Sequence, residues 1–192
     1  AAMLAIGVPT AAQAAIFLVD TSSDDGGPAF QVCDGVAGNG NCSLRGAITA
    51  LNAVAGPHTV FFNLAPTDPG FVPGSNHWRI TTGSDLPIIG RDLEINGYSQ
   101  PGAVANLQTP AQGGSTAVLK IELRSGNTGQ GAGLTVGNGS ANLRVQGLAI
   151  NGYQRNILLF SPGSHRIEGC FIGTGVDGLA LPPGQGGAVG IT

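Results

Sequence analysis

The chain has 192 residues, enough for one domain with an apolar core. It contains 33 glycines, and charged residues make up only 10% of it, against roughly 25% in an average globular domain. This composition argues against a helical bundle and favours short strands joined by tight turns, where glycine accepts a positive φ. The net charge is −3, and the eight Lys and Arg residues are scattered from Arg45 to Arg166, which argues against a nucleic-acid-binding surface.

The N-terminus has the pattern of the end of a signal peptide. Ala1 to Val8 is apolar, and Ala12-Gln13-Ala14 is an A-x-A cleavage site. The alternative is a buried, alanine-rich N-terminal helix. The apolar run is too short to cross a bilayer. We therefore expect residues 1–14 to be a signal-peptide remnant and the mature, secreted chain to begin near Ala15, with no membrane span in this segment.

The chain has three cysteines, two of them in one Gly/Asn-rich loop. Cys33 and Cys42 are close enough in sequence to form a disulfide in an exported protein. A metal site is the alternative, but it would need further ligands, and none is visible nearby. Cys170 is left over, and we expect it to act as a small apolar filler.

Four aspartates gather in the N-terminal loops: Asp20, Asp24, Asp25 and Asp34. Together with backbone carbonyls they could hold Ca²⁺. They lack the EF-hand spacing, and the Gly-rich aspartate nonapeptide of calcium β-rolls is absent. The alternative is that they are solvated turn residues, so we predict no cofactor and keep Ca²⁺ as the alternative.

One helix is predicted, followed by many short strands. An apolar stripe runs from Leu44 to Leu51 at helical spacing, and Ser43 is a good N-cap residue. A single helix before a run of strands suggests a lid over the open end of a solenoid. The predicted strands cover residues 16–19, 59–63, 77–81, 93–95, 118–123, 133–136, 143–145, 148–150, 157–160, 166–167, 170–172 and 189–192, and the Pro/Gly/Gln-rich loop 98–115 is expected to project.

An internal repeat decides the predicted fold. Val145 to Ile150 aligns with Ile167 to Ile172 at an offset of 22 residues, and Leu93 to Tyr98 resembles Leu148 to Tyr153. Three short strands and three turns fit into about 22 residues, the size of one coil of a parallel β-helix. We therefore predict an all-β fold, a right-handed parallel β-helix (solenoid) with a short N-terminal α-helical cap.

The domain prediction follows from this fold. We expect residues 15–57 to form the cap, with the disulfide loop and the capping helix, and residues 58–192 to form the coils. The sequence stops inside a predicted strand at Thr192, where an unpaired edge strand could pair with another chain and cause aggregation. We therefore expect further coils in a longer multidomain chain.

The cap segment resembles a known family. Cys42 to Ile48, with Ala50 and Asn52, resembles the C-S-L-R-E-A-I-x-x-A-N signature of CSLREA-domain proteins. Further stretches resemble the family in the same order: 95–103, 119–123, 147–152 and 167–174. The resemblance implies an exported bacterial parallel β-helix protein, and it supplies no catalytic residues. The family has Glu where this chain has Gly46. That Glu would complete a capping box, so we expect the helix to be weaker by about 1 kcal/mol.

Charged residues in the predicted strands are the candidates for a site on the outer face. Glu94 and Glu122 are weak catalytic candidates, because carbohydrate-active β-helix enzymes use neighbouring carboxylates for acid–base work. Lys120 and Arg124 would flank them as weak binding residues. The alternative is a solvated outer face of alternating charge. The three histidines, His58, His77 and His165, lie apart from carboxylates and cysteines in the sequence and are predicted as turn residues.

We predict a secreted or cell-surface scaffold of the adhesin-like type, without catalytic activity. Its expected partners are polysaccharides or host and cell-surface ligands. We expect it to be monomeric, as part of a longer multidomain chain. The alternative is a polysaccharide lyase or glycoside hydrolase of the pectate-lyase-like type. Fold analogy alone cannot name a ligand.

Overall fold

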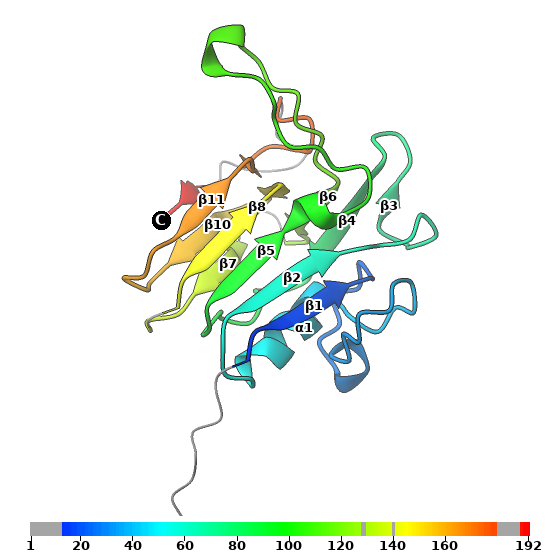
Figure 1. Ribbon diagram of the computed structural model, residues 1–192, viewed down its shortest axis with the longest axis vertical. Helices are drawn as coiled ribbons and strands as arrows, with labels where there is room; N and C mark the ends of the chain where they lie inside the picture. Colours follow the sequence, from blue (N-terminus) through cyan, green and yellow to red (C-terminus); the bar gives the residue numbers. More distant parts are fainter. Residues whose placement is uncertain (1–12, 128–129, 140, 180–188) are drawn as a thin grey trace, which may run out of the picture.

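The structure is a computed structural model that describes residues 13–127, 130–139, 141–179 and 189–192. The predicted signal peptide therefore lies almost wholly outside the described residues. The strands form three sheets (Figure 1). The first contains β1 (Ala15–Val19), β2 (His58–Phe62), β5 (Leu93–Asn96), β8 (Leu143–Gln146) and β11 (Arg166–Glu168), in that order.

The other two sheets lie behind the first in the view of Figure 1. One contains β13 (Val189–Ile191), β10 (Tyr153–Leu159) and β7 (Gln130–Val136), in that order. The other contains β12 (Phe171–Ile172), β9 (Leu148–Asn151), β6 (Ile121–Ser125), β4 (His77–Thr82) and β3 (Phe71–Val72), in that order. All pairs are parallel except β3 with β4. Three short 3-10 turns, Pro28–Phe30, Gly97–Ser99 and Pro110–Gln112, complete the elements.

The prediction of an all-β, right-handed parallel β-helix is wrong. The described residues form a mixed α/β structure of three mostly parallel sheets with one α-helix and an antiparallel β3–β4 pair. The 22-residue repeat does place β11 beside β8 and β12 beside β9 in register. The second similarity, between residues 93–98 and 148–153, would place β5 beside β9. Glu94 of β5 pairs instead with Arg144 of β8, so the repeat does not extend along the chain. One local repeat was therefore too small a basis for a whole architecture.

The core is a single apolar cluster to which all three sheets contribute. Val60 and Ile95 of the first sheet, Leu123 of the third and Ile157 of β10 are all fully or almost fully buried in it. In β2, β5 and β8 the buried side chains alternate with less buried, outward ones, as the pleat requires. Burial of these apolar side chains supplies most of the favourable free energy of folding.

The glycine of the repeated motif is explained by close packing at one corner. Gly147 and Gly169 have φ of 70° and 57°. A β-carbon on Gly147 would lie 2.7 Å from the ring of Tyr98. The Tyr98 hydroxyl donates to the carbonyl of Gly169 at 3.0 Å. Glycine therefore stands at equivalent places after β8 and β11 because one tyrosine ring covers both turns.

The helix α1 (Leu44–Asn52) forms where the sequence predicts it and packs beside β1 (Figure 1). Ser43 is its N-cap, and the Ser43 hydroxyl accepts from the Gly46 N–H at 2.8 Å. The weaker helix expected from Gly46 stays a prediction, but the packing leaves no room for a side chain at this position. A β-carbon there would lie 1.9 Å from the carbonyl oxygen of Phe30. Gly46 is therefore required by the close approach of the preceding turn.

We expect Gly46→Ala to lower the free energy of unfolding by about 2 kcal/mol. The overlap with the Phe30 backbone outweighs the gain of about 1 kcal/mol in helix propensity. Urea denaturation of the two proteins measures the difference. Thr49→Ala on the same helix is the matched control and should change the free energy by less than about 0.5 kcal/mol. A Gly46→Ala protein as stable as the original would contradict this packing.

Candidate ligand-binding face

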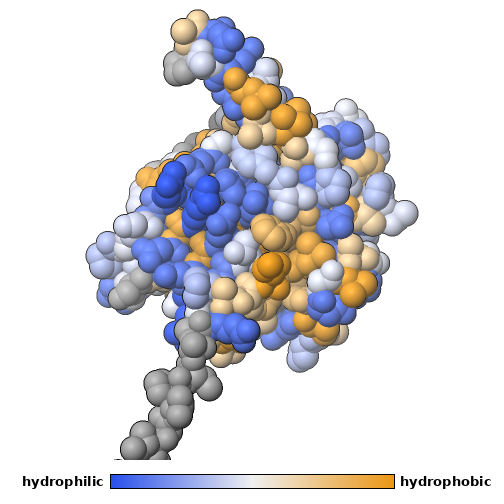
Figure 2. All heavy atoms as spheres, in the orientation of Figure 1, coloured by the Kyte–Doolittle hydropathy of each residue, from blue (hydrophilic) through white to orange (hydrophobic). Residues whose placement is uncertain are grey.

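The outer face of the first sheet carries two lateral rows of side chains. The register places Thr59, Glu94, Arg144 and Arg166 in one row across β2, β5, β8 and β11. The second row contains Phe61, Asn96, Gln146 and Glu168. The part on β5, β8 and β11 is called the polar face below; it consists of Glu94, Asn96, Arg144, Gln146, Arg166 and Glu168. Figure 2 shows a hydrophilic region at this place.

Charges of opposite sign alternate across the polar face. Arg144 lies between two carboxylates, at 3.4 Å from Glu94 and 3.1 Å from Glu168. Arg166 pairs with Glu168 from the other side. Hydrogen bonds from Arg166 first, and then from Arg144, lower the pKa of Glu168 below its ordinary value. These pairs are partly solvated, so they contribute little to stability and their charges stay accessible to a ligand.

A pocket of about 230 Å³ lies at the end of the sheet where β2, β5 and β8 begin. Asp92, Glu94, Arg144 and Arg166 line it, together with His58. His58 is only 3% exposed, and its Nε2 lies 3.1 Å from the carbonyl oxygen of Val54. That contact makes Nε2 the N–H donor and leaves Nδ1 as an acceptor. Among the described residues Nδ1 has no hydrogen-bond partner.

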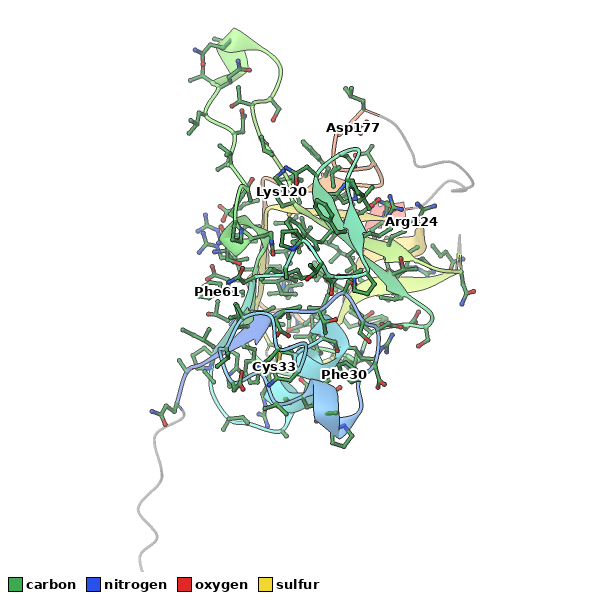
Figure 3. All side chains as sticks on the ribbon, turned by 90° about the vertical axis from the view of Figure 1, so that its right-hand side faces the viewer. Phe30, Cys33, Phe61, Lys120, Arg124 and Asp177 are labelled. Carbon is green, nitrogen blue, oxygen red and sulfur yellow. A yellow bond between two sulfur atoms is a disulfide. The ribbon has the colours of Figure 1, made fainter. Side chains whose placement is uncertain are left out.

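An apolar region borders the polar face on β1 and β2. Ile16 is 64% exposed, and Leu18 and Phe61 are partly buried on the same outer side. Figure 2 shows this region as hydrophobic beside the hydrophilic one. Figure 3 shows Phe61 at the outer side of the first sheet, with Arg124 on the opposite side of the molecule. An aromatic ring therefore stands next to the amide and charged groups.

The structure does not bring the two candidate carboxylates together. Glu94 belongs to the first sheet, whereas Glu122 belongs to β6 of the third. Glu94 accepts from Gln146 at 2.8 Å, within the polar face. Glu122 occupies an outward position of its strand, as predicted, but it is only 1% exposed. The side chains of His77, Arg79 and Asn151 contact it.

Glu122 is the centre of a buried polar cluster. Its Oε2 accepts from Arg79 Nε at 2.6 Å and lies 3.0 Å from His77 Nε2. Its Oε1 accepts from Asn151 Nδ2 at 2.9 Å, and the same amide donates to the Thr174 carbonyl. Burial alone would raise the pKa of Glu122, but hydrogen bonds from His77, Asn151 and Arg79 outweigh it and lower the pKa to about 2. The carboxylate is therefore ionised at neutral pH.

The predicted binding residues Lys120 and Arg124 do not join the polar face. Lys120 is nearly buried, and its ammonium group donates to the carbonyl oxygen of Asn76 at 2.6 Å. Arg124 lies near the end of β6, beside Thr81 and Asn151 in the register. Figure 3 shows these two labelled residues apart from each other. The binding strip that the sequence suggested is thus divided between two sheets.

The four N-terminal aspartates are held by separate donors and do not converge. Asp20 accepts from the N–H groups of Gly40 at 2.7 Å and Cys42 at 3.0 Å. Asp25 and Asp34 accept from nearby N–H groups, those of Gly27 and Val36, whereas Asp24 is held by the more distant Arg45. No group of three or more His, Cys, Asp or Glu residues that could hold a metal occurs in the described part of the chain.

The cysteines behave as the sequence predicts. Cys33 and Cys42 form a disulfide, and Cys170 is a free thiol packed against the core. The disulfide is consistent with an extracellular protein. Within the described ranges, no helix has the length and apolar character needed to cross a membrane.

Sequence reasoning missed two of the three histidines. His58 and His77 are strand residues, and both are 3% exposed. The prediction of a turn position is therefore wrong for His58, whereas the predicted strand 77–81 already contained His77, and its burial was missed. His165 precedes β11, and its Nδ1 accepts from the Leu143 N–H. The sequence did place His77 and Arg79 on the same side of a predicted strand, because they are two residues apart. It could not show that both side chains contact Glu122, which lies more than 40 residues further along the chain.

No family model, curated protein or solved structure matches this chain. The resemblance to CSLREA-domain proteins therefore stays a prediction.

We expect Glu122→Gln to lower the free energy of unfolding at pH 7 by about 3 kcal/mol, because it leaves buried donors without their charged acceptor. The folded-state pKa of Glu122 lies below its ordinary value of 4.5. Its stabilisation is therefore complete above about pH 4.5 and is lost as the pH falls toward 2. The variant should lose less stability than the original protein over that range, as denaturant titrations at several pH values would show.

Glu168→Gln is the matched control for this prediction, because it removes an exposed carboxylate that also pairs with arginine. It should leave the free energy of unfolding nearly unchanged. Equal losses in the two variants would contradict the special position of Glu122.

Proposed function

We propose that this chain is an extracellular, adhesin-like binding domain that takes up a polysaccharide or a similar polyhydroxylated ligand on the polar face, without cleaving it there. The observation that carries the proposal is the array of accessible carboxylate, amide and guanidinium groups beside a pocket that Asp92, Glu94, Arg144 and Arg166 line. Secretion and a bacterial cell-surface location belong to the same proposal. They are supported by the disulfide and by the A-x-A pattern at residues 12–14.

The chemistry of the polar face suits hydroxyl groups. Each sugar hydroxyl both donates and accepts, and the face offers acceptors on Glu94 and Glu168 and donors on Arg144 and Arg166. Adjacent strands are about 4.8 Å apart, so the row from β2 to β11 extends over roughly 15 Å. A polymer lying across the strands would meet donors and acceptors at several successive positions.

The pocket adds charged groups beside the polar face, because Glu94 and Arg144 belong to both. Asp92 and Arg166 line the same pocket and could hold neighbouring hydroxyls. The ring of Phe61 in the adjacent row supplies an apolar surface for a sugar face.

We expect Arg144→Ala to weaken glycan binding at least tenfold, because this guanidinium bridges the carboxylates of Glu94 and Glu168 and faces the pocket. A glycan array identifies ligands of the full chain, and titration calorimetry measures the affinity of the best one, with Ca²⁺ present and absent. Arg155→Ala, an exposed arginine of β10 in another sheet, is the control and should change the affinity less than about twofold.

The same ligands decide between binding and cleavage. Release of new reducing or unsaturated ends, abolished by Glu94→Gln, would replace the binding proposal by the polysaccharide lyase or glycoside hydrolase alternative. Failure to bind any polysaccharide on the array, or equal losses in Arg144→Ala and Arg155→Ala, would reject the polar face as the binding surface.

A further inference from the structure

A serine, a histidine and a glutamate form a hydrogen-bonded chain on the third sheet, away from the polar face. Ser75 Oγ lies 2.7 Å from His77 Nδ1, and His77 Nε2 lies 3.0 Å from Glu122 Oε2. The serine is exposed, whereas the histidine is 3% and the glutamate 1% exposed. The chain thus leads from a buried charge to a hydroxyl at the surface.

The charge of Glu122 fixes the tautomer of His77. An ionised carboxylate accepts only, so Nε2 of the neutral ring carries the proton that faces it. The other nitrogen, Nδ1, then has a free lone pair directed at Ser75 Oγ. The hydroxyl proton therefore lies in a hydrogen bond to a base, the arrangement that activates a serine nucleophile.

Other partners already satisfy the carboxylate. Arg79 and Asn151 donate to the two oxygens of Glu122 from the neighbouring strands. His77 is therefore one of three donors that hold the carboxylate in place. Its orientation by a carboxylate on one side and its contact with a surface hydroxyl on the other are the two contacts that base-activated nucleophiles require.

The turn that presents Ser75 is held in a fixed conformation. It joins β3 to β4, and Asn76 adopts a positive φ of 49°. The ammonium group of Lys120 donates to the carbonyl oxygen of Asn76 at 2.6 Å. The ammonium group therefore helps to hold the turn that presents the Ser75 hydroxyl.

We propose that Ser75, His77 and Glu122 form an acyl-transfer site that acts on carboxylic esters, with Ser75 as the nucleophile, His77 as the base and Glu122 as the group that orients it. Ser75 Oγ bonds to the ester carbonyl carbon as its proton moves to His77 Nδ1, and the carbonyl electrons form an oxyanion. The oxyanion collapses and expels the alkoxide, which takes the proton from Nδ1 and leaves as the alcohol. Water then repeats the sequence, releases the carboxylic acid and restores Ser75.

The decisive experiment is covalent labelling of the full chain with a fluorophosphonate, followed by peptide mass spectrometry. Ser75 Oγ should displace fluoride and gain the phosphonyl group, with the hydroxyl proton leaving as HF. We expect His77→Gln to slow this labelling at least 100-fold, because the general base is lost. Ser75→Ala should remove the label, and it alters only an exposed turn side chain, so its thermal midpoint should stay close to that of the original protein.

Ser115→Ala supplies the matched control, because Ser115 is an exposed serine in a loop whose hydroxyl accepts from the nearby Ala117 N–H and not from a histidine among the described residues. It should leave the label on Ser75 unchanged. Hydrolysis of p-nitrophenyl acetate should disappear in Ser75→Ala and persist in Ser115→Ala. No label on Ser75, or a label whose rate is the same in His77→Gln, would overturn the proposal. Neither result bears on glycan binding, which Arg144→Ala tests separately.

Discussion

The buried carboxylate of Glu122 is the constraint on which the third sheet depends. Removing a carboxylate from water costs several kcal/mol unless charged or hydrogen-bonding partners replace the water. Here the partners come from both neighbouring strands, with His77 and Arg79 on β4 and Asn151 on β9. The charge is satisfied only when β4, β6 and β9 pair in one register, because a shift by one residue would turn His77 and Arg79 to the apolar side. The cluster thus specifies register as well as stabilising the sheet.

The two five-stranded sheets use the same alternation with opposite results. In the first sheet the outward side chains of β5, β8 and β11 stay accessible and form partly solvated ion pairs. In the third sheet the outward Glu122 is closed off, and Asn151 beside it is bonded to Thr174 in the segment that follows β12. Accessible charges can exchange water for a ligand at little cost, whereas a buried charge can hold another side chain in a fixed tautomer. The polar face therefore suits binding, and the Glu122 cluster suits orienting a base.

Local features could be predicted from the sequence because they depend on residues close together in the chain. The helix with its Ser43 cap, the Cys33–Cys42 disulfide and most strands are of this kind. The fold class could not be extrapolated from one 22-residue repeat, since the helix, the β3–β4 pair and unequal spacings intervene. Likewise, alternation placed Glu122 on the outward side of its strand, but it cannot tell whether another segment covers that side. The constraint on Gly46 was missed for the same reason, because it comes from the Phe30 carbonyl and not from the helix itself.

Arg79 and Asn151 share the carboxylate of Glu122 with His77, and this sharing fixes the geometry of the Ser75–His77–Glu122 chain. Burial would raise the pKa of Glu122, but hydrogen bonds from His77, Asn151 and Arg79 outweigh it, so the carboxylate is ionised and can only accept. The proton of the neutral imidazole therefore lies on Nε2, and Nδ1 is left facing the Ser75 hydroxyl. Because Asn151 holds Oε1 and Arg79 holds Oε2, the carboxylate cannot rotate away from the ring without losing both contacts. The orientation of the ring is thus set by the pairing of β4, β6 and β9, whereas the hydroxyl that it faces lies on an exposed turn.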